Sequence, residues 1–459
     1  MLGATGSGKS STTGTHVARG MLHHGFGGLV LVAKEADGRT YWERLCRETG
    51  RQDDLVIISP ESGLRFNPFD FELNRPGRGA GKSENVTRLL LTLAEAAEKA
   101  GSTRGDRPAQ GNGDPFWKDS QSQMIRNSVE LLRLATGSVS IETLRKLILS
   151  APQSLDEARS EGWQNSSYCF SLLVLADERT KGVGERADLA LAMDYFLLEL
   201  PQLAARTRSI ITTSVTALTD TLSRGVLRDL FGSGSDITPA ASEEGKIILV
   251  DLPAKEFGEI GTIAGVIMKY CWQRSIERRD IRASPRPVFL FADEAQNFLT
   301  SYDMHFLATC RSVRVATVLL SQNVSNFYAA LGGGDLGRSL ADSMFANLNT
   351  KVLHANGDSV TNEWAANLIG KTRQFFVNAG NSQDDDLFYS VTGLGQSSRG
   401  NAGVSEQLDY EWAPSTFTAL RTGGELNRLL VDAVVFRSGQ PFTTGRNWLA
   451  TTLRQDEML

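Results

Sequence analysis

The sequence predicts an α/β protein, with a doubly wound, mostly parallel sheet and an inserted all-helical domain. Three observations support this class. Short apolar runs alternate with helical stretches in residues 1–81 and again in residues 236–459, apolar residues in 82–235 recur at helical spacing, and a glycine-rich loop precedes the first helix. Strands that alternate with helices are typical of a parallel sheet covered on both faces.

Residues 1–81 are predicted to form the first part of the sheet domain. A helix is expected at Lys9–Met21, directly after the glycine-rich loop. Apolar runs bounded by Gly, Asp or Pro predict strands at Leu29–Ala33 and Leu55–Ser59. The segment Asn74–Gly81 is rich in Gly, Pro and Arg, so the domain boundary is placed there.

Residues 82–235 are predicted to be the inserted helical domain. Apolar residues such as Leu89, Leu93 and Ala97 follow the helical period. A loop rich in Gly, Ser and Asp is expected at Gly101–Asp114. Further helices are expected at Ile141–Leu149, Ala187–Glu199 and Ile210–Ser223.

Residues 236–459 are predicted to complete the sheet domain. Helices are expected at Ile260–Arg278 and Ser359–Ile369, and a mobile surface loop at Gly380–Gly403. The predicted strands are Lys246–Asp251, Val288–Asp293, Val315–Gln322, Thr350–Leu353 and Leu430–Val435.

Composition excludes several classes of protein. A formal net charge of -5 argues against a polycation that coats DNA, so any nucleic-acid contact must be local. The four cysteines form no CxxC pair, which argues against a zinc site or a disulfide scaffold and fits a reducing cytosol. No apolar run approaches the length of about 18 residues that spans a bilayer.

The strongest motif is GATGSGKS at residues 3–10, which matches the phosphate-binding pattern G-x-x-x-x-G-K-[ST]. Glycines let consecutive N–H groups approach a triphosphate at the start of a helix. We expect Lys9 to pair with the β- and γ-phosphates of ATP and Ser10 to bind Mg²⁺. The alternative is a flexible Gly/Ser turn. The predicted nucleotide-binding residues are Gly3, Ala4, Thr5, Gly6, Ser7, Gly8, Lys9, Ser10 and Ser11.

The second motif is an apolar strand, VFLFA, followed by Asp293 and Glu294. It places Asp293 at the carboxyl edge of the sheet, where open α/β folds bind ligands. Asp293 is expected to hold Mg²⁺ and Glu294 to polarise the water that attacks the γ-phosphate. The alternative is that both carboxylates cap the next helix.

A third strand ends in Gln322, an amide that could hydrogen-bond the γ-phosphate or the attacking water and sense its loss. The alternative is a turn residue at the strand end. Arg311 and Arg314 precede this strand. They are either solvated cations or arginine fingers that reach the nucleotide of a neighbouring subunit.

Together these segments resemble the TraG/TraD-type coupling ATPases of conjugation and type IV secretion, which are RecA-like motors of the FtsK/HerA superfamily. The similarity also extends to EGKIILVDLP at 244–253, to TKVLHANGDSVTNEWAANLIGKT at 350–372 and to the tail that begins LLVDAVVF at 429. It covers nearly the whole chain and is weakest in the helical insertion.

The resemblance implies a homo-hexameric pump that uses ATP and Mg²⁺ and binds DNA, single-stranded by expectation, in a central channel. Its implied partners are a relaxase and the proteins of the secretion channel. It implies a place at the inner face of the bacterial inner membrane, with the helical insertion facing the cytoplasm. Two alternatives stay open: an assembly ATPase of the secretion channel, or a nucleotide-binding adaptor that does not hydrolyse ATP.

The sequence departs from the family at its start. Family members carry a membrane anchor, a linker and a β-strand before the phosphate loop, whereas here Met1 and Leu2 precede Gly3. We therefore expect that the strand and anchor come from preceding sequence or from another chain. Without that strand, the neighbouring strands would expose unpaired backbone groups, so poor ATP binding and aggregation are expected.

Overall fold

The computed structural model describes residues 1–34, 38–75, 79, 81–102, 115–382 and 399–455. The chain divides into two compact units, and each is described by itself. The first unit comprises Met1–Thr12, Gln322–Ser325 and Asn349–Glu457, and the second comprises Thr13–Ser321 and Asn326–Leu348.

A five-stranded parallel sheet forms the centre of the second unit. Every residue of the three inner strands is buried, so helices cover the sheet on both faces, as the near-continuous apolar runs predict. The order of the strands is β2 (Leu55–Ile58), β3 (Ile247–Val250), β1 (Gly27–Leu31), β4 (Val288–Ala292) and β5 (Val315–Leu319).

Aromatic packing holds helix α2 (Arg39–Glu48) to this sheet. The Trp42 ring stacks on Phe289 at 6.1 Å between centroids and meets Phe291 edge-on at 5.2 Å. Gly28 stands opposite Phe289 in the register, and a Cβ at Gly28 would lie 2.6 Å from that ring. The glycine therefore makes room for the ring on the sheet surface.

Helix α15 (Glu259–Glu277) is apolar on nearly all sides because it packs against β1 and β3 and also against helix α4 (Ser83–Ser102). Its one buried cation, Lys269, forms an ion pair with Asp303 of α16 (Tyr302–Thr309). Gln273 and the Thr300 backbone N–H also donate to the Asp303 carboxylate, at 2.7 Å each. This network satisfies a charge that would otherwise destabilise the interior.

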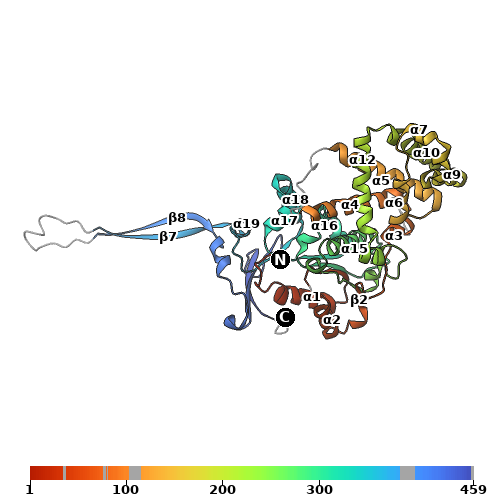
Figure 1. Ribbon diagram of the computed structural model, residues 1–459. Helices are drawn as coiled ribbons and strands as arrows, with labels where there is room; N and C mark the ends of the chain where they lie inside the picture. Colours follow the sequence, from red (N-terminus) through yellow and green to blue (C-terminus); the bar gives the residue numbers. More distant parts are fainter. Residues whose placement is uncertain (35–37, 76–78, 80, 103–114, 383–398, 456–459) are drawn as a thin grey trace, which may run out of the picture. The chain divides into compact units, whose positions relative to one another are not determined.

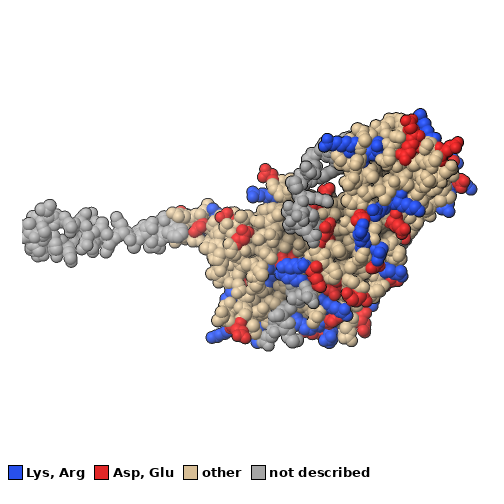
Figure 2. Space-filling model, in the orientation of Figure 1, with Lys and Arg blue, Asp and Glu red and all other residues tan. Residues whose placement is uncertain are grey.

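All elements that the structure describes between residues 83 and 231 are helices, which cluster at one end of the second unit (Figure 1). None of the described helices is both long enough and apolar enough to cross a membrane. Acidic and basic side chains are interspersed over the face that Figure 2 shows. The main helices are α4 (Ser83–Ser102), α5 (Pro115–Thr136), α6 (Ile141–Leu149), α9 (Tyr168–Arg179), α10 (Val183–Asp194) and α12 (Ala205–Leu222).

The first unit contains a second sheet, whose strands pair antiparallel in the order β10 (Trp448–Arg454), β9 (Leu430–Arg437) and β6 (Thr350–Leu353). The sequence analysis assigned β6 and β9 to the parallel sheet and missed β10. An apolar run indicates that a segment forms a strand. Whether that strand pairs parallel or antiparallel depends on its partner strand, which lies far away in the sequence. Helix α19 (Ser359–Ile369) follows β6 within its predicted bounds.

A long hairpin, β7 (Lys371–Ser382) and β8 (Arg399–Tyr410), extends from this unit (Figure 1). It corrects the predicted loop at Gly380–Gly403, since 380–382 and 399–403 are strand residues and the remainder lies outside the described residues. The side chains described near its base are mostly exposed, so no apolar face marked these strands in the sequence. Of the predicted loop at Gly101–Asp114, residues 101–102 belong to α4 and the rest also lies outside the described residues.

Candidate nucleotide-binding site

The glycine-rich loop of the first unit begins beside the end of β6. Leu2 pairs with Leu353 in parallel: the Leu2 N–H donates to Val352 O and the His354 N–H donates to Leu2 O, both at 2.8 Å. The Ala4 N–H donates to Ala355 O at 2.8 Å. These backbone bonds fix where the loop starts and which way it turns.

Two of the motif glycines are required by close approach. Gly8 has φ +83°, and a Cβ there would lie 2.6 Å from Val431 Cγ2 of β9. At Gly3 a Cβ would lie 2.6 Å from the Cβ of His354. A side chain at either position would push the loop off the sheet, and at Gly8 it would also strain the backbone.

Lys9 folds back over the loop. Its Nζ donates to Gly3 O at 2.6 Å and to Ala4 O at 3.1 Å, and the residue is buried. The chain then continues through a π-helical turn, Ser10–Gly14, into α1 (Thr15–His23), where one helix was predicted at Lys9–Met21. A cation held at the mouth of a loop that opens a helix is the arrangement that the motif predicts for phosphate binding.

Gln322 lies beside the first residue of the loop. Its backbone oxygen accepts from the Gly3 N–H at 3.2 Å and from Asn356 Nδ2 at 2.9 Å. The structure thus brings the predicted sensor to the phosphate loop. Asn356 also lies at this point and was not predicted. Like Gln322, it is a polar amide that comes after an apolar strand, so the same signal could have found it.

His354 is buried against the loop start. Burial, followed by nearby positive charges that include Lys9, lowers its pKa to about 3. The imidazole is therefore neutral at physiological pH and adds no positive charge beside Lys9.

In the second unit, Asp293 and Glu294 follow β4 directly and are both buried. The Asp293 N–H donates to Leu31 O of β1 at 3.0 Å, and Asp293 Oδ1 accepts from the Glu294 N–H at 3.0 Å. Glu294 has φ +46° and its side chain does not cap the short 3₁₀ turn Ala295–Asn297. A buried, left-handed glutamate at a sheet edge is the kind of strained position found at functional sites.

The Glu294 carboxylate contacts Lys34 and Gln296. Lys34 Nζ lies 2.9 Å from Oε1, and Gln296 Nε2 donates to Oε2 at 2.8 Å. Lys34 was not predicted from the sequence; it lies shortly after β1, which ends at Leu31, and Asp293 directly follows the neighbouring β4. Because both strands end at the same edge of a parallel sheet, their following residues meet there.

The two predicted arginine fingers lie at the other edge of this sheet, before β5. Arg311 is exposed in the turn Cys310–Val313, and Arg314 has φ +53° with its Nη1 donating to Pro285 O at 2.8 Å. Asp293 follows the carboxyl end of β4, whereas these arginines stand at the amino end of β5. The structure therefore does not bring them to Glu294 of the same chain.

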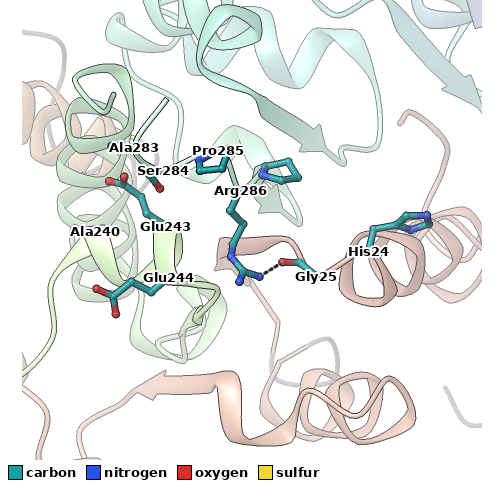
Figure 3. A pocket seen from close by; sticks show the side chains of 10 residues that line it. His24, Gly25, Ala240, Glu243, Glu244, Ala283, Ser284, Pro285 and Arg286 are labelled. Atoms are coloured by element: carbon teal, nitrogen blue, oxygen red, sulfur yellow. Dashed lines mark hydrogen bonds between the residues drawn. The ribbon is translucent and has the colours of Figure 1, made fainter. Parts of the chain in front are cut away.

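A hollow of about 770 Å³ also lies at the amino edge of the sheet (Figure 3). Arg286 closes one side by donating to Gly25 O at 2.5 Å, and burial raises the pKa of Glu243. The hollow lies at the opposite end of the strands from Asp293 and Glu294. Its lining residues are His24, Gly25, Ala240, Glu243, Glu244, Ala283, Ser284, Pro285, Arg286 and Pro287.

The ion pair between Lys34 and Glu294 is testable by stability. Replacing Lys34 with Met should lower the free energy of unfolding by about 1–2 kcal/mol, because it leaves a buried carboxylate without its cation. Adding Glu294→Gln should recover most of that loss. Urea unfolding followed by fluorescence measures both, with Lys255→Met on the exposed surface as control. Equal effects of Lys34→Met and Lys255→Met would contradict the pairing.

His354 should make stability depend on pH. Its pKa is lower in the folded chain than the ordinary value near 6.5, so the unfolded chain binds the extra proton as pH falls. Stability should therefore be full above pH 6.5 and decline toward pH 5, by about 2 kcal/mol from this residue. His354→Gln should flatten that part of the unfolding profile, whereas His305→Gln, at an exposed histidine, should not. Parallel profiles for wild type and His354→Gln would refute this.

Comparison with known families gives one match. Residues 287–407 match the family described as the TraM recognition site of TraD and TraG. This segment contains β4, Asp293, Glu294, both arginines and Gln322. No curated protein sequence matches the chain.

Solved structures match over the full length. The unbound bacterial conjugative coupling protein TrwBdeltaN70 aligns with a TM-score of 0.57 at 16% identity, covering 99% of this chain and 84% of that one. TrwB in complex with ADP and Mg²⁺ gives the same values, and TrwB with the GTP analogue GDPNP aligns at 0.56 and 16%, covering 99% and 85%. The comparisons thus agree with the resemblance drawn from the motifs: residues 287–407 match a segment of TraD and TraG, and the chain has the fold of the solved TrwB coupling-protein structures.

Proposed function

We propose that the chain is an ATP-driven coupling protein of a conjugative type IV secretion system, which moves relaxase-bound DNA toward the secretion channel. The observation that carries the proposal is the phosphate loop, in which Gly3 and Gly8 pack where a Cβ would not fit and Lys9 is held against the carbonyl groups of the loop. The similar protein TrwB has been solved with ADP and Mg²⁺ and with nucleotide analogues, which supports a nucleotide at this loop.

In this proposal, different residues bind the phosphates, hold Mg²⁺ and act on the attacking water. Residues Gly3–Ser11 bind the phosphates, with Lys9 on the β- and γ-phosphates. Ser10 and Asp293 supply the hard oxygen donors that Mg²⁺ prefers. The remaining ligands of the ion would be phosphate oxygens and water. Bound Mg²⁺ would neutralise charge on the phosphates, while Glu294 orients the attacking water and Gln322 senses the γ-phosphate.

The partners follow from the family segment. The family that residues 287–407 match is described as the TraM recognition site of TraD and TraG, so we propose that a relaxosome protein of that kind docks on this segment. We further propose a hexamer that works at the inner face of the inner membrane with single-stranded DNA in its central channel. The interspersed surface charges and the net charge of -5 fit a DNA contact confined to that channel.

Nucleotide chemistry gives the first test. Lys9→Ala should weaken binding of Mg·ATP, because the triphosphate loses its main charge partner. Glu294→Gln should preserve binding and stop turnover, since the amide has nearly the same shape but cannot take up the proton of the attacking water. Phosphate release with and without single- and double-stranded DNA measures turnover. If the Glu294→Gln variant hydrolyses ATP at the wild-type rate, Glu294 has no part in the mechanism. If DNA does not change the rate of hydrolysis, the assembly ATPase is the better interpretation.

Assembly gives the second test. If Arg311 or Arg314 completes the site of a neighbouring subunit, its replacement by Ala should lower turnover by about 10³ with little change in nucleotide affinity. Mixing that variant with Lys9→Ala subunits should raise turnover above that of either variant alone, because a Lys9→Ala subunit can supply its intact arginine to a neighbour whose Lys9 is intact. No gain on mixing, or unchanged turnover in both arginine variants, would show that neither arginine acts in trans.

A further inference from the structure

A tight loop in the first unit, Gly423–Leu429, has an unusual backbone. Gly423, Gly424, Arg428 and Leu429 all have positive φ, at +85°, +73°, +55° and +58°. Two consecutive left-handed residues that are not glycine are uncommon and cost energy. Hydrogen bonds from Arg428 N to Glu425 O at 2.9 Å and from Leu429 N to Gly424 O at 2.8 Å hold this shape.

The loop is tied directly to the phosphate loop. The Gln455 side chain bridges them: its Oε1 accepts from the Gly424 N–H at 2.8 Å and its Nε2 donates to Ser11 Oγ at 3.2 Å. Val431, which follows the loop, also lies against the phosphate loop: a Cβ at Gly8 would be 2.6 Å from Val431 Cγ2. The loop therefore stands next to the end of the phosphate motif, beyond Lys9.

The base of the loop is rigid. Arg421 forms a two-pronged ion pair with Asp432, at 2.8 and 2.7 Å, and Thr452 Oγ1 donates to Asp432 at 2.7 Å. Hydrogen bonding to Arg421 lowers the pKa of Asp432 to about 2, so the pair persists across the physiological range. Side chains on the loop are thus presented from an anchored frame.

Two of those side chains suit a flat aromatic ligand. Leu426 is fully exposed, at 100%, and Arg428 is also exposed. An aliphatic side chain can pack on one face of a base, and a guanidinium can stack on an aromatic ring. A nucleotide whose phosphates lie in the Gly3–Ser10 cradle must extend its nucleoside out of that cradle.

We propose that the loop Gly423–Leu429 is the base-binding element of the nucleotide site, with Leu426 and Arg428 contacting the purine. This inference rests on the proposed nucleotide binding and deepens it by assigning residues to the base. Packing and stacking recognise the ring and not its edge, so ATP and GTP should bind with similar affinity. The left-handed Arg428 and Leu429 are the conformational cost of presenting these side chains.

The test compares a ligand with a base to one without. Isothermal titration of the full chain with Mg·ATP and with Mg·tripolyphosphate should show that Leu426→Ala and Arg428→Ala each weaken ATP binding by about tenfold, while tripolyphosphate binding is unchanged. Lys9→Ala should weaken both ligands. Leu336→Ala, at a 70% exposed leucine on helix α18 (Gly334–Asn347), is the matched control and should change neither.

The outcomes separate the two proposals. If the wild type binds neither ligand, the proposed nucleotide function fails. If the wild type binds ATP but the loop variants bind both ligands as wild type does, the base contact is wrong. Equal weakening of ATP and tripolyphosphate would show that the loop supports the phosphate cradle and does not contact the base.

Discussion

The backbone bonds between the end of β6 and the loop start are the constraint on which the site depends. Leu2 and Ala4 continue the hydrogen-bond pattern of β6 through Val352 and Ala355, so the loop leaves the sheet at one place and in one direction. Gln322, Asn356 and His354 gather around that point because they follow strand ends or belong to the same turn. Few side chains are needed to shape a cradle made of backbone N–H groups.

In the second unit, burial of a strand fixes the position of the two candidate carboxylates. β4 is covered on both faces, so Asp293 and Glu294 emerge at its edge from a rigid strand. The left-handed Glu294 persists because Lys34, Gln296 and the backbone bonds of Asp293 hold it from several directions. A carboxylate held this way has its orientation set before any ligand binds.

Sequence alone was informative where a signal is local. The phosphate motif, the apolar strand before Asp293 and the helices Ile141–Leu149 and Ser359–Ile369 were all predicted, because glycine spacing and apolar period lie within each segment. Lys34 and the loop Gly423–Leu429 were missed since their partners are far away in the chain. The hairpin β7–β8 was also missed, because the side chains described near its base are mostly exposed and form no apolar face. The roles of Arg311 and Arg314 stay predictions.

Hydrogen–deuterium exchange with and without Mg·ADP tests the central claim most directly, because it locates the ligand on the backbone. Nucleotide should slow exchange in peptides covering Gly3–Ser11 and Gly423–Leu429, since cradle N–H groups donate to the phosphates and the bound base contacts the loop. Lys9→Ala should abolish both effects. Protection confined to other segments, such as the hollow beside Arg286, or no protection of Gly3–Ser11 at saturating nucleotide, would contradict it.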